Sequence, residues 1–172
     1  MTGSHPFPSS RERGFTLLEM VIVVVLAAMV TLGLVGFYLQ SQSMWMEAST
    51  QALAQRDATS LVELMRTKGA QAAKALVLPS SPDSLNHLIV FYDNADNEQS
   101  RFFWSQADSF VHYGDAVNAD QGAVISTIVE RFSLNAHPTL PLVHLDTLRV
   151  RATSGPQVRM STSFALYNGT PL

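Results

Sequence analysis

Hydrophobic and polar residues divide the chain into parts with different periodicities. From Met20 to Leu39 no side chain is charged and most residues are apolar. Twenty residues at 1.5 Å rise make a helix of about 30 Å, which is enough to cross the hydrocarbon core of a bilayer. This run therefore predicts a transmembrane helix close to the N-terminus.

The next part of the chain is polar but keeps a helical period. No proline occurs until Pro79, and small or apolar residues recur at spacings of three and four: Ala58, Val62, Met65, Gly69, Ala72 and Leu76. Such a stripe is typical of a helix that lays one face on a core, and much less often of a ligand site. The pattern predicts one long helix from about Phe15 to about Leu76, ended by the segment Leu78–Pro82.

After Pro82 the period changes toward two. The segments 86–93 and 101–104 are rich in β-formers and flank a polar loop at 94–98, which indicates a hairpin. Further strands are expected at 109–113 and 124–134. The alternation is clearest in the last two strands, which are joined by a turn at 153–156 and place these residues on one face: Leu148, Val150, Ala152, Val158, Met160, Thr162, Phe164 and Leu166. The pattern predicts an antiparallel sheet covered on one side.

Composition narrows the class of protein. The chain has 172 residues, of which 47% are hydrophobic and 15% charged, so one modest domain with an anchor is expected. The net charge is -3, and Lys and Arg are scattered along the sequence, so nucleic-acid binding has no support. The absence of cysteine excludes disulfides, a Cys-ligated zinc site and a thiol nucleophile.

The charges that flank the apolar run predict its orientation. Arg11 and Arg13 precede it, whereas the first charged residue after it is Glu47. The positive-inside rule then places the N-terminus in the cytoplasm and the rest of the chain outside. An ordinary cleaved signal peptide is the alternative, but its apolar region would be shorter, and the nearest Ala-x-Ala, at 52–54, is far from the end of the run.

The stretch Arg11–Met20, RERGFTLLEM, carries a more specific pattern. A basic residue and Gly14 come before the apolar run, followed by Phe15 and, four residues later, Glu19. This arrangement resembles the class III signal of type IV pilins and type II secretion pseudopilins. The resemblance implies that a prepilin peptidase cuts on the cytoplasmic side between Gly14 and Phe15, and that Phe15 is then N-methylated.

Glu19 places a carboxylate at the edge of an otherwise uncharged membrane segment. At the bilayer centre such a group costs about 2.5–3.5 kcal/mol, and the helix dipole returns only about 0.3–1 kcal/mol. A cation would offset the rest, and cleavage creates one at the amine of Phe15. The resemblance implies an assembly contact between Glu19 and the N-terminal amine of a neighbouring subunit. The alternative is that Glu19 extends to the cytoplasmic headgroups.

The resemblance also implies an architecture and a function. The fold is expected to be α+β and pilin-like, with a leader at 1–14, a transmembrane and filament-core helix at 15–40, an amphipathic continuation at 41–78 and an antiparallel sheet of a periplasmic domain at 79–172. The expected protein is a minor pilin or pseudopilin, similar to J-type or W-type subunits. Its expected partners are the peptidase, other pilins or pseudopilins and an inner-membrane assembly platform. The competing class is a single-pass anchored periplasmic domain with a ligand-binding or enzymatic role.

Motifs for catalysis or cofactor binding are missing from the sequence. The five histidines show no metal-binding spacing: His5, His87, His112, His137 and His144. There is no P-loop, no Gly-x-Ser-x-Gly and no Ser-x-x-Lys, so we expect no catalytic residue and no cofactor. Two acidic groups could offer oxygens to calcium but lack EF-hand spacing and are interpreted as turns: Asp93, Asp96 and Glu98, and Asp115, Asn118 and Asp120. No metal site is expected.

Overall fold

A computed structural model describes residues 15–78, 86–115, 122–137, 140–152 and 155–166. A single helix, α1, spans Leu17–Gln71. The boundary between the two compact units of the chain lies inside this helix, between Met44 and Trp45. Gly14 and the rest of the expected leader lie outside the described residues.

Within the described residues, seven strands follow α1 and form two antiparallel sheets. The first sheet has the order β1-β2-β3-β4, and the second has the order β5-β6-β7. Their bounds are β1 Lys74–Leu78, β2 Asn86–Tyr92, β3 Glu98–Ser105, β4 Val111–Asp115, β5 Ile128–Ala136, β6 Leu142–Arg151 and β7 Val158–Ala165. Each strand pairs with its sequence neighbour except at the β4–β5 step, where the chain moves from one sheet to the other.

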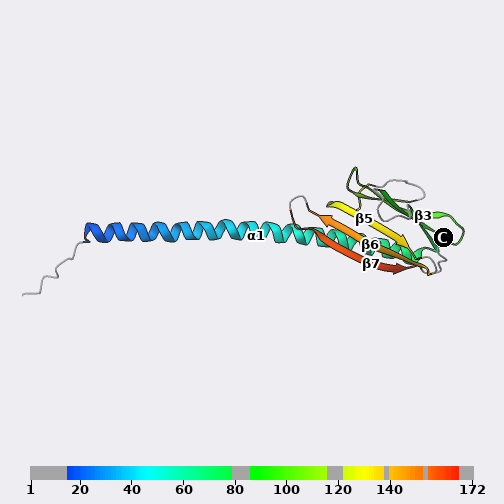
Figure 1. The fold of residues 1–172 in the computed structure, drawn as a ribbon, viewed down its shortest axis with the longest axis horizontal. Helices are drawn as coiled ribbons and strands as arrows, with labels where there is room; N and C mark the ends of the chain where they lie inside the picture. Colours follow the sequence, from blue (N-terminus) through cyan, green and yellow to red (C-terminus); the bar gives the residue numbers. More distant parts are fainter. Residues whose placement is uncertain (1–14, 79–85, 116–121, 138–139, 153–154, 167–172) are drawn as a thin grey trace, which may run out of the picture. The chain divides into compact units, whose positions relative to one another are not determined.

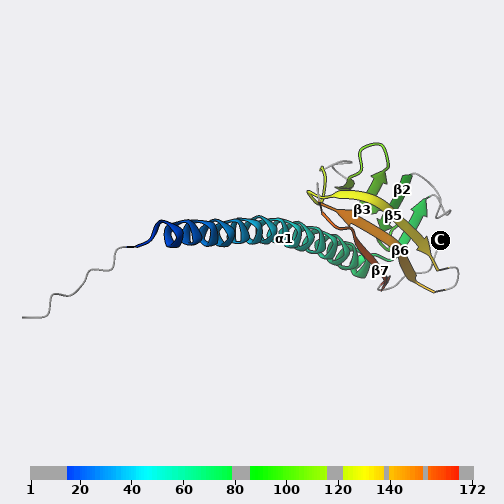
Figure 2. The ribbon, with the colours of Figure 1, turned by 60° about the vertical axis from the view of Figure 1, so that its left-hand side comes forward.

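The core of the second unit lies between α1 and the sheets. The part of α1 after Trp45 runs along β6 and β7 in both views (Figures 1 and 2). Its buried residues recur at three and four positions: Ala54, Ala58, Leu61, Met65 and Gly69. Gly69 is needed for close packing, because a Cβ there would lie 2.8 Å from Cδ2 of Phe164 on β7 and 3.5 Å from Cε1 of Phe91 on β2. The helix therefore contacts both sheets at this turn.

Hydrogen bonds join the elements that are distant in sequence. The indole Nε1 of the buried Trp104 on β3 donates to the carbonyl of Val129 on β5 at 3.0 Å. The carboxylate Oδ2 of Asp57 on α1 accepts four hydrogen bonds of 3.0–3.2 Å from the backbone N–H and hydroxyl groups of Ser126 and Thr127. These bonds tie the segment before β5 to α1 and hold the two sheets together.

The structure confirms the expected fold class, a long N-terminal helix packed on antiparallel strands. The predicted hairpin is present, with β2 and β3 joined at residues 93–97. In the last two strands the predicted apolar residues face the core, with Leu148, Val150 and Phe164 buried and Val158 and Met160 packed against them. The turn expected at 153–156 lies partly outside the described residues.

Four predictions require correction. The helix ends at Gln71 rather than near Leu76, and residues 74–78 form β1, because the N–H of Ala73 already donates to the carbonyl of Tyr92 and leads the chain into the sheet. The strands form two sheets rather than one. The strand expected at 109–113 begins at Val111, because Ser109 has a φ of 62°, outside the β region. The strand expected at 124–134 begins at Ile128, because the two preceding residues, Ser126 and Thr127, are hydrogen-bonded to Asp57 instead.

Candidate functional site: the start of the membrane helix

The start of α1 is organised by two side chains. Thr16 directly precedes the first helical residue, and Glu19 is the third residue of the helix. The backbone N–H and the hydroxyl of Thr16 donate to Oε2 of Glu19 at 2.9 and 3.0 Å, and the backbone N–H of Glu19 contacts Oγ1 of Thr16 at 3.2 Å. This reciprocal pairing is a capping box, in which each side chain satisfies a backbone donor that the helix itself cannot.

The capping box gives Glu19 a partner within its own chain. The sequence-based interpretation paired the carboxylate with an amine created by cleavage or with the cytoplasmic headgroups, and it did not include Thr16. The signal was nevertheless present, because Thr16-Leu17-Leu18-Glu19 has the Thr-x-x-Glu spacing of a capping box. Phe15, one residue before the cap, is not helical and its side chain is 77% exposed. The three residues Phe15, Thr16 and Glu19 thus form one compact group at the helix start.

The apolar residues that follow have no core to cover them. All described residues from Phe15 to Ser49 are exposed, including every large apolar side chain between Met20 and Leu39. By length and composition, α1 is the one described helix able to span a membrane. An exposed, uncharged surface around the whole circumference of a helix suits lipid or other helices and not water.

Two of the histidines lie close together in the structure. The rings of His137 and His144 have centroids 5.7 Å apart, and Nδ1 of His144 lies 2.6 Å from Oγ of Ser163. His112 pairs with Asp108 at 2.9 Å, and the buried His87 stacks on Trp104. Among the residues that the structure describes, no group of three or more His, Asp or Glu side chains is arranged to hold a metal ion.

The first acidic group forms a turn, as interpreted from the sequence. Oδ1 of Asp93 accepts hydrogen bonds from the backbone N–H groups of Ala95 and Asn97 at 2.8 and 2.9 Å. Asp96 pairs with Lys74, and Glu98 forms two bonds with Arg101. Their carboxylates therefore do not converge. In the second acidic group, Asn118 and Asp120 lie outside the described residues.

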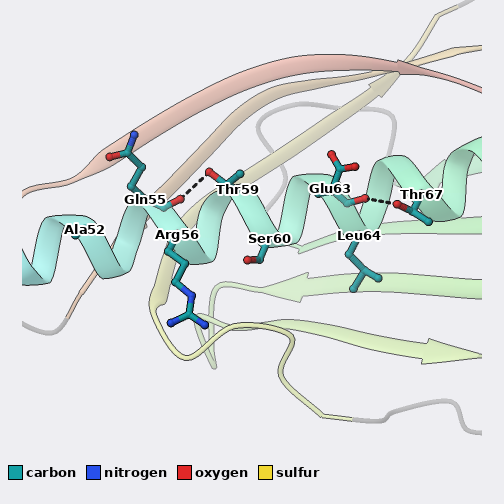
Figure 3. Close-up of a pocket in the computed structure, with 8 residues that line it drawn as sticks. All are labelled: Ala52, Gln55, Arg56, Thr59, Ser60, Glu63, Leu64 and Thr67. Atoms are coloured by element: carbon teal, nitrogen blue, oxygen red, sulfur yellow. Dashed lines mark hydrogen bonds between the residues drawn. The ribbon is translucent and has the colours of Figure 1, made fainter.

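An open hollow of about 780 Å³ lies along α1 in the second unit (Figure 3). It is lined by residues of the helix alone: Ala52, Gln55, Arg56, Thr59, Ser60, Glu63, Leu64 and Thr67. Two of its hydroxyl groups are hydrogen-bonded to the helix backbone. Thr59 donates to the carbonyl of Gln55 and Thr67 to the carbonyl of Glu63, each at 2.8 Å.

Comparison with known proteins identifies the N-terminal segment. Residues 9–35 match the family model described as the prokaryotic N-terminal methylation motif. The comparisons with curated proteins and with solved structures each gave no match. The matched segment spans the expected cleavage site, the capping box and most of the apolar run. It supports a type IV pilin-like protein whose apolar N-terminal helix fits membrane anchoring, and the motif implies processing by prepilin peptidase and assembly with other pilins.

Proposed function

We propose that this protein is a minor pilin or pseudopilin, a structural subunit that is assembled into, or primes, a filament of a type II secretion or type IV pilus system. The observation that carries the proposal is the methylation motif at residues 9–35, placed directly before and within an exposed apolar helix. The protein binds and assembles, and it catalyses no reaction. The resemblance of its hairpin and last strand to J-type or W-type minor subunits supports the minor rather than the major class.

The geometry around Phe15 supports cleavage between Gly14 and Phe15. A peptidase needs its substrate in an extended and accessible form, and Phe15 and Thr16 are exposed and non-helical. The helix begins at Leu17, two residues beyond the proposed scissile bond. The cut therefore leaves the helix and its cap intact, and the new amine lies next to the residue that Glu19 already binds.

The proposed role of Glu19 has two stages. In the separate chain its carboxylate accepts from Thr16 and stabilises the start of the helix. In a filament it would exchange part of this contact for the charged amine of Phe15 on a neighbouring subunit. A charged donor forms a stronger hydrogen bond to a carboxylate than a neutral one does, so the exchange favours assembly.

The proposed location follows from the flanking charges. Arg11 and Arg13 keep the N-terminus in the cytoplasm, so the sheets are placed in the periplasm until the subunit joins a filament. The prepilin peptidase and an inner-membrane assembly platform are the proposed partners in the membrane. The competing function, an anchored periplasmic enzyme or ligand-binding domain, is favoured by no observation on the described residues.

Mass spectrometry of the mature N-terminus tests the proposal. The full chain is produced with and without a prepilin peptidase and isolated from membranes. The expected product with the peptidase lacks residues 1–14 and carries one methyl group on the nitrogen of Phe15. A chain that keeps residues 1–14 in the presence of an active peptidase would overturn the proposal. Gly14→Ala should be processed much better than Gly14→Leu, which separates a steric requirement at the cut from loss of expression.

A further inference from the structure

Within the described residues, four strands form the edges of the two sheets, and three of these edges have a neighbour in the chain. The edges are formed by β1, β4, β5 and β7. On β4, the carbonyl of Val111 accepts a hydrogen bond from the N–H of Val124 at 2.9 Å. On β5, the N–H of Val129 donates to the carbonyl of Ser109 at 2.8 Å. The edge strand β1 contacts β5. The edge that remains is that of β7.

The backbone of β7 presents an open edge. The N–H of Leu166 donates to the carbonyl of Pro141 at 2.8 Å, so these two residues are a hydrogen-bonded pair at the end of the ladder between β6 and β7. Hydrogen-bonded and non-hydrogen-bonded pairs alternate along an antiparallel ladder. The backbone N–H and C=O groups of every second residue of β7 therefore point away from β6: Arg159, Ser161, Ser163 and Ala165. No backbone hydrogen bond from the described part of the chain reaches this edge, which is the margin of the second sheet (Figure 1).

The strand also lacks the features that protect the edges of sheets. Edge strands that must not pair with other proteins are usually very short, or contain proline, a bulge or inward-pointing charges. β7 has eight residues, no proline or glycine, and one charged side chain, that of Arg159. The irregularity in its ladder lies on the β6 side, where two residues between Leu145 and Leu148 face one residue of β7. An unprotected edge of this length is a template for a further strand.

The side chains of β7 define the kind of strand that fits. On the face toward the core, Val158 and Met160 are only half-buried at the margin of the core, so apolar side chains of an added strand would extend the core there. On the other face, Arg159 is exposed and forms no ion pair with a described residue. A carboxylate opposite Arg159 on the added strand would complete a cross-strand pair of opposite charge.

We propose that the outer edge of β7 pairs with an extended strand of a second protein, in which apolar and polar residues alternate and a carboxylate lies opposite Arg159. The outward backbone groups of β7 supply the affinity, and the alternating side chains select the partner. A second copy of this chain fits less well through its own β7, because this strand contains no carboxylate. The proposal does not depend on cleavage at Gly14 or on the role of Glu19, since all of β7 lies in the second unit.

Amide hydrogen exchange in the presence of a synthetic strand tests the proposal. The probe is a peptide as long as β7, in which valine alternates with threonine and one central threonine is replaced by glutamate. It is added at up to about 1 mM to the full chain in detergent micelles, so that weak binding is also detected. In the chain alone, the amides of Arg159, Ser161 and Ser163 should exchange rapidly, whereas those of Thr162 and Phe164 are protected by β6. The probe should slow exchange in the first group about tenfold and leave the second group unchanged.

Two kinds of variant separate backbone pairing from charge. Ser161→Pro removes an outward N–H and should weaken binding about tenfold, because proline is accepted on an edge strand where its N–H would face solvent but cannot donate to a partner. Ser161→Thr keeps this N–H and should bind like the wild type. Arg159→Glu should weaken binding of the glutamate probe about fivefold, and a probe with lysine in place of glutamate should restore it.

A probe that is N-methylated at two adjacent residues keeps the test decisive if Ser161→Pro does not fold. It lacks a donor on each of its edges, and it should give no protection. The proposal would be overturned by equal protection with the methylated probe, by no protection with the unmodified probe, or by amides of Ser161 and Ser163 that are already as protected as that of Thr162 in the chain alone. Protection that appears without a probe and rises with protein concentration would assign the edge to a second copy instead.

Discussion

Thr16 and Glu19 are hydrogen-bonded to each other at the first turn of α1, where the Thr16 N–H and hydroxyl donate to Oε2 of Glu19 at 2.9 and 3.0 Å. The carboxylate that is unusual at the edge of a membrane segment is therefore also a helix cap. These two roles predict different behaviour in variants. The cap needs an oxygen acceptor at residue 19, whereas pairing with an amine needs a negative charge there.

Glu19→Gln separates the cap from the charge. Glutamine can also complete a capping box, so the helix start should remain as ordered as in the wild type. Glutamine cannot neutralise an amine, so incorporation into filaments should fall about tenfold or more, as expected for a lost charge-assisted bond. The measurement is the fraction of processed subunit found in sheared filaments, or crosslinked to other pilins, compared with the fraction in the membrane.

Two further variants complete this experiment. Glu19→Ala removes both roles and should still be inserted and cleaved but assemble poorly, whereas Glu47→Gln removes a helical carboxylate beyond the apolar run and should assemble normally. Wild-type incorporation of Glu19→Gln would show that the carboxylate acts only as a cap.

Asp57 should be the most sensitive charged residue of the second unit. One of its oxygens accepts all four hydrogen bonds from Ser126 and Thr127, and Thr127 is only 6% exposed. Asp57→Ala leaves these donors without their acceptor and should lower the free energy of unfolding by about 2–3 kcal/mol. Asp57→Asn keeps an oxygen and should lower it by about 1 kcal/mol.

The control for Asp57 is another acidic residue of α1. Glu63 contacts Arg66 at 3.9 Å with both side chains mostly exposed, so Glu63→Ala should change stability by less than about 0.5 kcal/mol. Urea unfolding in detergent, followed by tryptophan fluorescence, measures all three variants. Equal stability of Asp57→Ala and Glu63→Ala would show that the segment before β5 is held by packing alone.

The features that were predicted from sequence are those with a local signal. The alternation of Leu148 and Val150 determines which face of β6 is buried, and the polar loop at 94–98 marks a hairpin because both strands are adjacent in sequence. Asp57 and Thr127 are 70 residues apart, and neither shows a pattern that points to the other. The placement of Arg149 directly opposite both Arg131 and Arg159 could not be predicted either. It depends on which strands pair and on a register shift between Val129 and Arg131.

The pattern of apolar residues at the end of α1 is compatible with both a helix and a strand. Ala72 and Leu76 continue the helical spacing of the stripe, yet residues 74–77 also alternate between half-buried and buried, as in a strand. Pairing with β2 decides between them, since β1 matches β2 over five residues from Lys74 to Leu78. A contact that forms only in the folded chain thus overrides a local period.

Gly69→Ala tests the close approach of α1 to the sheets. Alanine favours helix by about 1 kcal/mol over glycine, but its Cβ would lie 2.8 Å from a ring carbon of the buried Phe164. We expect the steric clash to outweigh the gain in helix propensity, so that the free energy of unfolding falls by about 1 kcal/mol. Adding Phe164→Leu should recover part of this loss, because it removes the ring that meets the new methyl group.

Gly36→Ala is the matched control for Gly69→Ala. Nothing lies within 4 Å of a Cβ at Gly36, so the separate chain should tolerate the methyl group without loss of stability. Thermal unfolding in detergent measures both variants. Tolerance of alanine at Gly69 equal to that at Gly36 would show that the helix and Phe164 can move apart without cost.

The hairpin turn between β2 and β3 should loosen in acid. Hydrogen bonds from the backbone and side chain of Asn97, and from the backbone of Ala95, hold the pKa of Asp93 below its usual value. Because the folded pKa lies below the unfolded value of about 3.9, the stabilisation is complete above that pH and is lost as the pH falls through the folded pKa. Hydrogen exchange of the Asn97 amide should therefore become faster below about pH 4, because the turn opens when Asp93 is protonated. Asp93→Asn should abolish this pH-dependent opening. Asp146→Asn, which removes an exposed carboxylate from β6, should leave it unchanged. The same pH dependence in Asp93→Asn as in the wild type would assign the opening to another group.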